Sequence, residues 1–425
     1  MNRFSIEALA KLWHGHLARV SWAGRPCHKE FCKSLRRLDM MKIHNVIAWG
    51  LAVAASLTLK AASPVDLSPI KELLSIPSVS ADVAANDKAI DWMRGYLESR
   101  GVWCVVETFP KDGRKILYAA TKPDLKAPDY VLVTHLDVVA PASPTQFVPV
   151  EREGRLYARG ACDTKVNAFC GAEALIRLNG RASVGCVFAS DEEIGGNTTK
   201  HMVSLGYGHP QKAVVVLDAG SMSPDVRYAC KGNAYYKVTA TGRSGHSARP
   251  EACDNPIYKL AEAAMKIRDA YPHQKPGEYG NVASVTIIGG GDSQNRIPET
   301  ASMTVNVRFV SGGLEDQRVL VEHITGLKTE LIRGTDAAIS RPDDPEILRM
   351  QRLMKAAYPE RACDIVRGLG ANDSRYFPQF GKPMMTVSMD HDGGHTDNEW
   401  CSVRDIPRFI GLLMAYLAPP DVIGK

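Results

Sequence analysis

The sequence predicts an α/β protein built on a mainly parallel β-sheet, into which a two-layer domain of β-α-β-β-α-β order is inserted. A chain of 425 residues is too long for one ordinary hydrophobic core, so we expect more than one domain. Over residues 63–227, uniformly apolar strands alternate with helices, a pattern typical of a parallel sheet covered on both faces. At 228–335 the strands instead alternate apolar and polar residues in β-α-β-β-α-β order. The first pattern returns at 336–425, which indicates an insertion within one α/β domain.

The first part begins with two predicted helices, one starting at Pro69 and one running through Trp92 to Tyr96, with a loop at Pro77–Asn86 between them. The elements expected next are strands Val102–Thr108, Ile116–Ala120 and Tyr130–Ala140, a helix from Val166 to Leu178, strand Val184–Ser190, helix Thr198–Leu205 and strand Ala213–Leu217. The apolar strands of this list are the expected core of the parallel sheet.

The inserted part has its own expected order of elements. These are strand Tyr235–Thr241, helix Pro256–Ala270, strands Val282–Ile288 and Met303–Phe309, helix Leu314–Ile324 and strand Leu327–Ile332. The last part is expected to hold helix Pro345–Tyr358, strand Pro383–Met389 and helix Val403–Leu417. We therefore predict a leader at 1–62, a main α/β domain at 63–227 and 336–425, and an inserted domain at 228–335.

The positive charge of the chain is concentrated in its first 62 residues. The formal net charge is +5, but residues 1–62 hold ten Lys and Arg against three acidic residues, which leaves −2 for the remainder. We therefore expect no general nucleic-acid surface on the folded body. Lys42 and the apolar run Ile47–Leu59 resemble a secretory signal peptide that is too short to span a bilayer. We expect an exported protein; the competing interpretations are a helix that packs on the body, and a cytoplasmic location.

The stretch Tyr130–Ala140 carries the first candidate site residues, His135 and Asp137. Side chains two residues apart in a strand point to the same face, so this pair stands together at the end of a buried strand. A carboxylate in that position can hold the second nitrogen of the imidazole and improve the first as a metal ligand. The alternative is a strand whose end is polar by chance.

Four further segments end an apolar run with potential metal ligands, which are Asp163, the acidic run from Asp191 to Glu193, Asp218 and His395. Sites in open α/β sheets form at the carboxyl ends of the strands, so these side chains are expected to converge. Oxygen and imidazole ligands without thiolates suit Zn²⁺, with Co²⁺ or Mn²⁺ possible. Two such ions could act together on a water molecule and a carbonyl group. Any one of these acids could instead cap a helix.

The adjacent residues Glu192 and Glu193 suggest two different roles in one site. Neighbouring residues in a turn point in different directions, so one carboxylate can bind metal while the other serves as a general base. The sequence thus predicts metal-dependent hydrolysis.

Five strings, THLDVVAP, ARGACDTK, SDEEIGG, LDAGS and GGHTDNEW, resemble in order and spacing the dinuclear zinc aminoacylase/carboxypeptidase family. That family includes acetylornithine deacetylases, succinyl-diaminopimelate desuccinylases, glutamate carboxypeptidases and di- and tripeptidases. The resemblance covers about 66–420 and implies two Zn²⁺ ions in a zinc-peptidase catalytic domain. It implies that one ion is held by His135, Asp163 and Asp218, and the other by Asp163, Glu193 and His395. It further implies that Asp163 bridges the ions, Asp137 orients His135, and Glu192 is the general acid/base.

The inserted part resembles the lid and dimerisation domain of the same family. The motif around His246, GRSGHSARP, looks like the one whose histidine reaches the active site of a neighbouring subunit, which implies a homodimer. The segments around Asn295 and Arg308 resemble those that supply an asparagine and an arginine to the substrate. A guanidinium that binds a substrate carboxylate makes chemical sense there.

Two departures from the family pattern bear on the substrate. Asp218 stands where the family's deacylases more often have glutamate and its dipeptidases aspartate. The Gly-Thr-Ser-Asp string of the desuccinylases is Gly-Ala-Asn-Asp here, so Ala371 lacks a hydroxyl that helps those relatives hold the acyl carboxylate. We expect a di- or tripeptidase or other exopeptidase acting on short peptides. The alternatives are an N-acyl-amino-acid deacylase and a non-catalytic binding protein.

Overall fold

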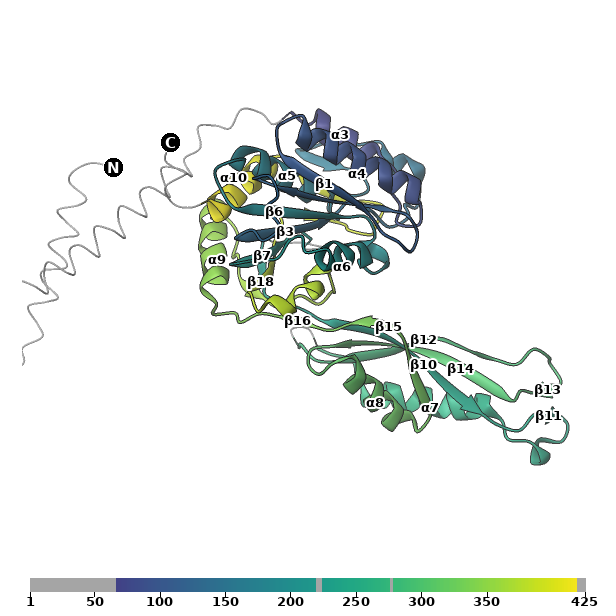
Figure 1. Ribbon diagram of the computed structural model, residues 1–425. Coiled ribbons are helices and arrows are strands. Elements are labelled where there is room, and N and C mark those ends of the chain that lie inside the picture. Colours follow the sequence, from purple (N-terminus) through teal and green to yellow (C-terminus); the bar gives the residue numbers. More distant parts are fainter. Residues whose placement is uncertain (1–65, 219–223, 276–277, 419–425) are drawn as a thin grey trace, which may run out of the picture. The chain divides into compact units, whose positions relative to one another are not determined.

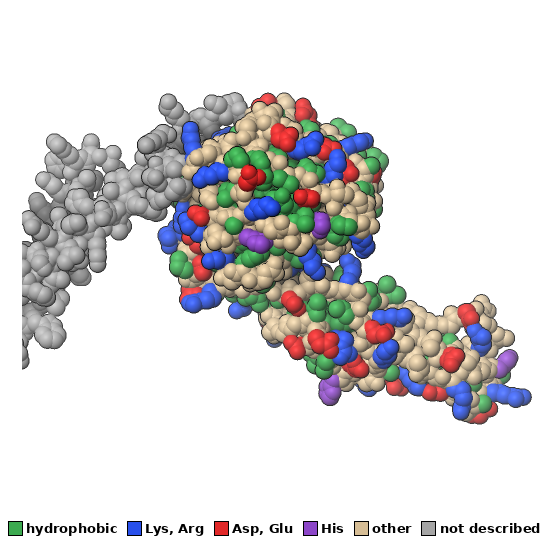
Figure 2. Space-filling model, in the orientation of Figure 1, with side chains coloured by type: hydrophobic (Ala, Val, Ile, Leu, Met, Phe, Trp, Pro, Cys, Tyr) green, Lys and Arg blue, Asp and Glu red, His purple; other side chains and the backbone are tan. Residues whose placement is uncertain are grey.

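The computed structural model describes residues 66–218, 224–275 and 278–418. The predicted leader and signal segment at 1–62 lie outside the described residues. Within those described ranges, no helix is long and apolar enough to cross a membrane. On the face drawn in Figure 2, Lys and Arg side chains are interspersed with Asp and Glu.

The main sheet has eight strands in the order β1-β2-β6-β3-β7-β18-β8-β17. Its central strands β6, β3, β7 and β18 are parallel, as are β8 and β17 at one edge. The predicted mainly parallel sheet is therefore confirmed, with antiparallel pairs at β1-β2, β2-β6 and β18-β8. The strands are β1 Trp103–Thr108, β2 Lys115–Ala120, β3 Tyr130–His135, β6 Val184–Ala189, β7 Ala213–Val216, β8 Val226–Arg227, β17 Ile365–Val366 and β18 Met384–Thr386.

Both faces of this sheet are buried, which explains the continuous apolar runs. Leu132 of β3 packs into one core cluster, whereas its neighbours Val131 and Val133 pack into another on the opposite face. Successive strand residues alternate between faces, so a strand covered on both sides needs apolar residues at every position. The helices are α3 Ser68–Ser75, α4 Val83–Glu98, α5 Lys165–Leu178, α6 Asn197–Ser204, α9 Pro345–Ala357 and α10 Asp405–Leu417. Helices α3, α4, α5 and α10 lie on one side of the sheet and α6 on the other (Figure 1).

A second sheet has the order β12-β14-β10-β15 and is antiparallel throughout. Its elements along the chain are β10 Gly232–Thr241, α7 Pro256–Ala270, β12 Val282–Gly290, β14 Thr300–Phe309, α8 Leu314–Thr325 and β15 Lys328–Thr335. The predicted β-α-β-β-α-β order is confirmed. Leu260 and Ile267 of α7 and Val321 of α8 pack with the sheet in a core cluster of their own.

Several short elements were not predicted. A four-stranded sheet joins β4 Val150–Arg152, β5 Arg155–Tyr157, β19 His391–Asp392 and β20 Trp400–Ser402, and two-stranded pairs join β9 Ala229–Cys230 with β16 Ala338–Ile339 and β11 Gly245–His246 with β13 Arg296–Ile297. The 3₁₀ helices are η1 Pro144–Phe147, η2 Glu192–Ile194, η3 Pro250–Ala252, η4 Asp373–Tyr376 and η5 Pro378–Phe380. Strands of two or three residues are too short to show a period in the sequence.

Several element boundaries differ from the predictions. The expected strand Tyr130–Ala140 is shortened to β3, Tyr130–His135, so Asp137 lies just after the strand and not in it. The expected loop Pro77–Asn86 ends early because α4 already begins at Val83, where the Asp82 side chain accepts a hydrogen bond from the backbone N–H of Ala85. Asp82 is therefore the N-cap of α4. The proline and serine residues before it are typical of a loop, which is why the sequence predicted a later start of the helix. The expected strand Pro383–Met389 is shortened to β18, Met384–Thr386, because only these residues pair with β7.

Candidate metal centre and active site

Four of the predicted site residues follow strand ends at the same edge of the main sheet, whereas Asp163 and His395 follow β5 and β19 of the small four-stranded sheet and not strands of the main sheet as predicted. His135 is the last residue of β3, Glu192 and Glu193 lie in η2 three and four residues after the end of β6, and Asp218 follows β7 by two residues. Because β6, β3 and β7 are adjacent and parallel, their carboxyl ends meet there. Asp163 directly precedes Thr164, the residue before α5, and His395 follows β19.

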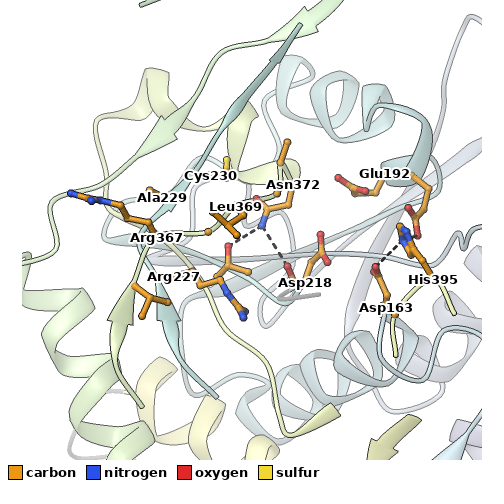
Figure 3. Close-up of a pocket in the computed structure, with 17 residues that line it drawn as sticks. Asp163, Glu192, Asp218, Arg227, Ala229, Cys230, Arg367, Leu369, Asn372 and His395 are labelled. Atoms are coloured by element: carbon orange, nitrogen blue, oxygen red, sulfur yellow. Dashed lines mark hydrogen bonds and ion pairs between the residues drawn. The ribbon is translucent and has the colours of Figure 1, made fainter. Parts of the chain in front are cut away.

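Asp163 lies between the two histidines. Its Oδ1 is 3.0 Å from Nε2 of His135, and its Oδ2 is 3.2 Å from Nε2 of His395. Nε2 of His395 is also 3.1 Å from Oε1 of Glu193, and Nε2 of His135 is 3.9 Å from Oδ1 of Asp218. Figure 3 shows Asp163, Asp218 and His395 around one cavity. One carboxylate thus faces both histidines, which is the arrangement expected of a bridging ligand.

The donor atoms form two groups of a size that suits metal ions. His135, Glu192 and Asp218 make up one group and Asp163, Glu193 and His395 the other, and within each group the donor atoms lie within 4.8 Å of one another. Each group offers one imidazole and two carboxylates, which suits divalent cations such as Zn²⁺. Cys162 beside them is fully buried, in line with a packing role.

Charge in the site also favours cations. Burial raises the pKa of Glu192 well above its usual range, against the effect of the nearby Arg375. Burial and the Asp163 carboxylate raise the pKa of Asp218. For Asp163 itself, burial acts in the same direction, but hydrogen bonds from His135 and His395 outweigh it and lower its pKa. Buried carboxylates this close together repel one another, and bound divalent ions would remove the repulsion.

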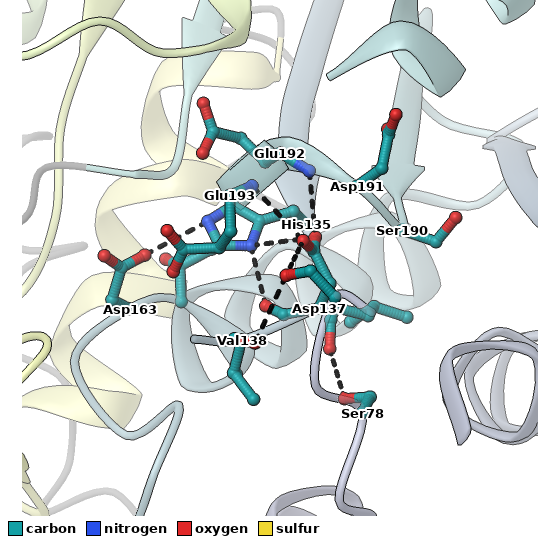
Figure 4. Close-up of polar contacts among 12 residues, drawn as sticks. Ser78, His135, Asp137, Val138, Asp163, Ser190, Asp191, Glu192 and Glu193 are labelled. Carbon is teal, nitrogen blue, oxygen red and sulfur yellow. Dashed lines mark hydrogen bonds and ion pairs between the residues drawn. The ribbon is translucent and has the colours of Figure 1, made fainter. Parts of the chain in front are cut away.

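Asp137 connects His135 to the turn that carries the glutamates (Figure 4). Its Oδ1 is 3.4 Å from Nδ1 of His135, while its own backbone carbonyl is closer, at 2.9 Å. The same carboxylate accepts hydrogen bonds from the backbone N–H groups of Glu192 and Glu193, at 3.0 and 3.2 Å, and from Ser80 Oγ at 2.8 Å. Asp137 is therefore placed to fix the orientation of η2 as well as of the imidazole.

Sequence reasoning missed Glu399, which holds the loop that carries Asp163. This fully buried side chain accepts hydrogen bonds from the backbone N–H groups of Gly160, Cys162 and Asp163, each at 2.9 Å, and pairs with Arg159 at 2.6 Å. Glu399 stands in the GGHTDNEW string, but nothing in the string indicates a partner more than 230 residues away. In the same string, Gly393 has φ 77°, and a side chain there would clash with the Asn398 carbonyl.

Sequence reasoning also missed Arg375 in η4. Its Nη2 donates to Oε1 of Glu192 at 3.1 Å and to Oδ1 of Asp373 at 3.0 Å. Asp373 in turn accepts from Thr199 Oγ1 at 2.5 Å. Gly196 lies so close that a Cβ there would clash with the Asp373 carboxylate. Arg375 therefore sets the direction in which Glu192 points.

The three predicted residues of the inserted part do not all lie together, because Arg308 is far from the other two. His246 and Asn295 line a second cavity of about 520 Å³ with Asp292 and Arg296. Arg308 is near the far end of β14, which begins at Thr300, so about 26 Å of strand separates these ends at roughly 3.3 Å per residue. None of the three lines the cavity of about 500 Å³ at Asp163, Glu192, Asp218 and His395, as far as the described residues define it.

Comparison with known proteins agrees with this site. A succinyl-diaminopimelate desuccinylase of Wolbachia pipientis from Culex pipiens is 25% identical over 382 residues, covering 83% of this chain and 92% of that protein. A tripeptidase of Staphylococcus aureus has a similar fold, with a TM-score of 0.67 and 16% identity over 84% of this chain and 98% of its own. An M20 family metallo-carboxypeptidase of Sulfolobus solfataricus gives a TM-score of 0.66 with 16% identity, covering 83% of this chain and 98% of its own.

The family model for peptidase family M20/M25/M40 matches residues 131–418, which is more than half of the chain and includes every candidate metal ligand. The chain therefore belongs to peptidase family M20/M25/M40 and is a metal-dependent hydrolase of amide bonds.

Proposed function

We propose that this hydrolase cleaves the amide bond of short peptides with the help of two zinc ions. The observation that supports this most directly is the Asp163 carboxylate lying between His135 and His395, with Glu192 at the same cavity. A binding protein without activity is no longer a competing interpretation, because the family consists of hydrolases.

The proposed ligands are His135, Asp163 and Asp218 for one ion, and Asp163, Glu193 and His395 for the other, with Asp163 shared. When bound, two zinc ions would polarise the substrate carbonyl. They would also lower the pKa of a water molecule, so that it can give up a proton and attack the carbonyl at neutral pH. The chain itself contributes the geometry, since Asp137 and Glu399 hold the segments on which these ligands lie.

Glu192 is the proposed general base and acid. Its carboxylate takes a proton from the attacking water and then delivers it to the leaving amine. Burial raises its pKa, which makes the carboxylate a stronger base for the first step, and the hydrogen bond from Arg375 keeps one carboxylate oxygen in place.

The choice between a peptide and an N-acyl amino acid rests on two positions. Asp218 at the metal site and Ala371 in the cavity wall support the peptide. The desuccinylase relatives support the N-acyl alternative, at 25% identity.

We expect dipeptides to be cleaved with a higher kcat/KM than acetylated or succinylated amino acids. Arg308→Ala should raise KM most for substrates with a free carboxylate, since a lost charge-assisted contact costs roughly 2–4 kcal/mol. Steady-state kinetics of the zinc-loaded enzyme on matched dipeptides, dipeptide amides and N-acyl amino acids measures both effects. A clear preference for an N-acyl substrate would reverse the order of the two proposals.

We further propose that residues 228–335 form a domain, inserted between 63–227 and 336–425, through which two copies form a homodimer. Strand β12 is an edge of its sheet and exposes Ile287 and Ile288, which are 66% and 51% accessible. Tyr258 and Met265 are exposed on α7, which packs beside β12. Apolar side chains on an unpaired edge strand are typical of a surface that a second chain covers.

The protein is also proposed to be exported through its signal-like segment at Ile47–Leu59. A chain that starts at Ser63 should then be active, and the native protein should be cleaved near Ala61 to Pro64. N-terminal sequencing of the protein from fractionated cells tests this. An intact N-terminus in the cytoplasmic fraction would decide against export.

A further inference from the structure

The wall of the main cavity beyond the metal ligands contains an arginine. Arg227 of β8 is paired with Thr386 of β18 on one side and with Val366 of β17 on the other. Residues that oppose one another across strands point to the same face of a sheet. All three line the cavity, together with Asp163, Glu192, Asp218 and His395. Arg227 therefore stands in the same hollow as the candidate metal centre.

The order of the strands places the backbone of Arg227 close to the strand that leads to Asp218. Thr386 is also paired with Val216 of β7, the strand that leads to Asp218. The backbone of Arg227 is thus two strands away from the backbone of β7, or about 10 Å at roughly 4.8 Å per strand. Because this is a separation between backbones, the Arg227 side chain covers part of it, and one acidic residue or a short dicarboxylic acyl group of the substrate has to cover only the rest.

The charges that line the cavity differ at its two ends. Four carboxylates lie at the metal end, and two divalent ions would balance their charge. Arg227 and Arg367 then leave the cavity with an excess of positive charge. The Arg367 guanidinium, however, donates to the Tyr228 hydroxyl at 2.8 Å and lies over the Tyr279 ring, and Figure 3 shows it pointing away from the metal ligands.

The surroundings of Arg227 are polar in a way that suits an anionic partner. Asn372 Nδ2 donates to Thr386 Oγ1 at 2.9 Å, so the hydroxyl hydrogen of Thr386 stays available as a donor beside Arg227. A guanidinium offers two parallel N–H donors to a carboxylate, and a hydroxyl can add a third.

We propose that Arg227 is a specificity-determining residue that binds a carboxylate of the substrate, carried by the residue or acyl group at the scissile bond. The proposal rests on the proposed function and narrows it to substrates with an acidic group. These are peptides with an acidic residue next to the scissile bond, or N-acyl amino acids with a dicarboxylic acyl group.

The test uses substrate pairs that differ only in charge. Asp-Ala is compared with Asn-Ala, Glu-Ala with Gln-Ala, and N-succinyl-alanine with the half-amide N-succinamyl-alanine, on the zinc-loaded full chain. The wild-type protein should prefer the acidic member of at least one pair by roughly 10- to 100-fold in kcat/KM. Arg227→Gln should reduce that ratio to about one by raising KM for the acidic member, with kcat and the neutral member nearly unchanged. Arg227→Lys should recover part of the preference.

Arg367→Gln is the matched control, because Arg367 lines the same cavity with its guanidinium held by Tyr228, and it should keep the wild-type ratio. The substrate pair whose kcat/KM ratio changes in Arg227→Gln tells whether the carboxylate belongs to an amino acid or to an acyl group. An equal loss on acidic and neutral members, or a preference that survives in Arg227→Gln, overturns the proposal.

Binding separates this proposal from the proposed function. Calorimetric titration with succinate and with succinamate measures the charge preference without turnover. Tighter binding of succinate that Arg227→Gln removes supports the role of Arg227, even if none of the substrates is hydrolysed and the proposed function fails. Hydrolysis without any charge preference, together with equal binding of the two ligands, contradicts the role of Arg227 alone.

Discussion

Replacing Glu192 with glutamine is expected to remove nearly all turnover and to leave the metal content unchanged. Glutamine has the same shape and can still accept the hydrogen bond from Arg375, whose Nη2 is 3.1 Å from Oε1 of Glu192. It cannot accept a proton from water or return it to the amine. General acid–base catalysis typically contributes about 10²–10⁴-fold, so kcat should fall by at least that factor. Turnover of a dipeptide and metal content by mass spectrometry give the two readouts.

Glu193→Gln is the matched control, because Glu193 is the neighbouring side chain and lies 3.1 Å from His395. It should lose metal affinity as well as activity. The geometry makes this comparison necessary, since the Glu192 carboxylate also falls within the group formed by His135 and Asp218. If Glu192→Gln loses one metal ion, Glu192 is a ligand; if it keeps full activity, the assigned mechanism is wrong.

The sequence predicted those site residues that can be identified from a short segment of the chain alone. His135 ends an apolar run and is followed by Asp137, and Glu192 and Glu193 follow the next parallel strand. Strand ends are readable from hydrophobic patterns, and neighbouring parallel strands bring their ends together. The candidate ligands at these strand ends could therefore be named before their distances were known.

The supporting residues could not be predicted in this way. Glu399 binds the backbone of the Asp163 loop, and Arg375 binds a carboxylate 183 residues earlier in the chain. These contacts depend on how β5 pairs with β20 and on where η4 lies, and neither has a periodic signal. Arg227 could not be predicted either, because β8 and β17 have only two residues each. They pair with each other, and β8 alone pairs with β18.

His246 is expected to act in the active site of a partner subunit. Within one chain, His246 and Asn295 lie beyond the Thr300 end of β14, whereas Arg308 lies near its other end. About 26 Å of strand is far longer than a dipeptide, which spans roughly 7 Å, so one short substrate cannot contact both ends. The family resemblance implies that His246, Asn295 and Arg308 all contact the substrate. In that case His246 and Asn295 must come from a second copy related by two-fold symmetry.

Co-expression of two inactive variants should therefore restore activity. An imidazole that donates to the oxyanion formed when water attacks contributes about 10²–10³ in rate, so His246→Ala alone should be nearly inactive, as should Glu192→Gln. In a mixed dimer, Glu192 of the first chain meets His246 of the second, and one of the two sites is intact. With random pairing about half the dimers are mixed, so activity should recover to about a quarter of the wild-type value.

His323→Ala, which removes another exposed histidine from α8, is the control and should stay active as a homodimer. Differently tagged chains establish that mixed dimers have formed. If purified mixed dimers are as inactive as their parents, His246 acts within its own chain or the two sites depend on each other.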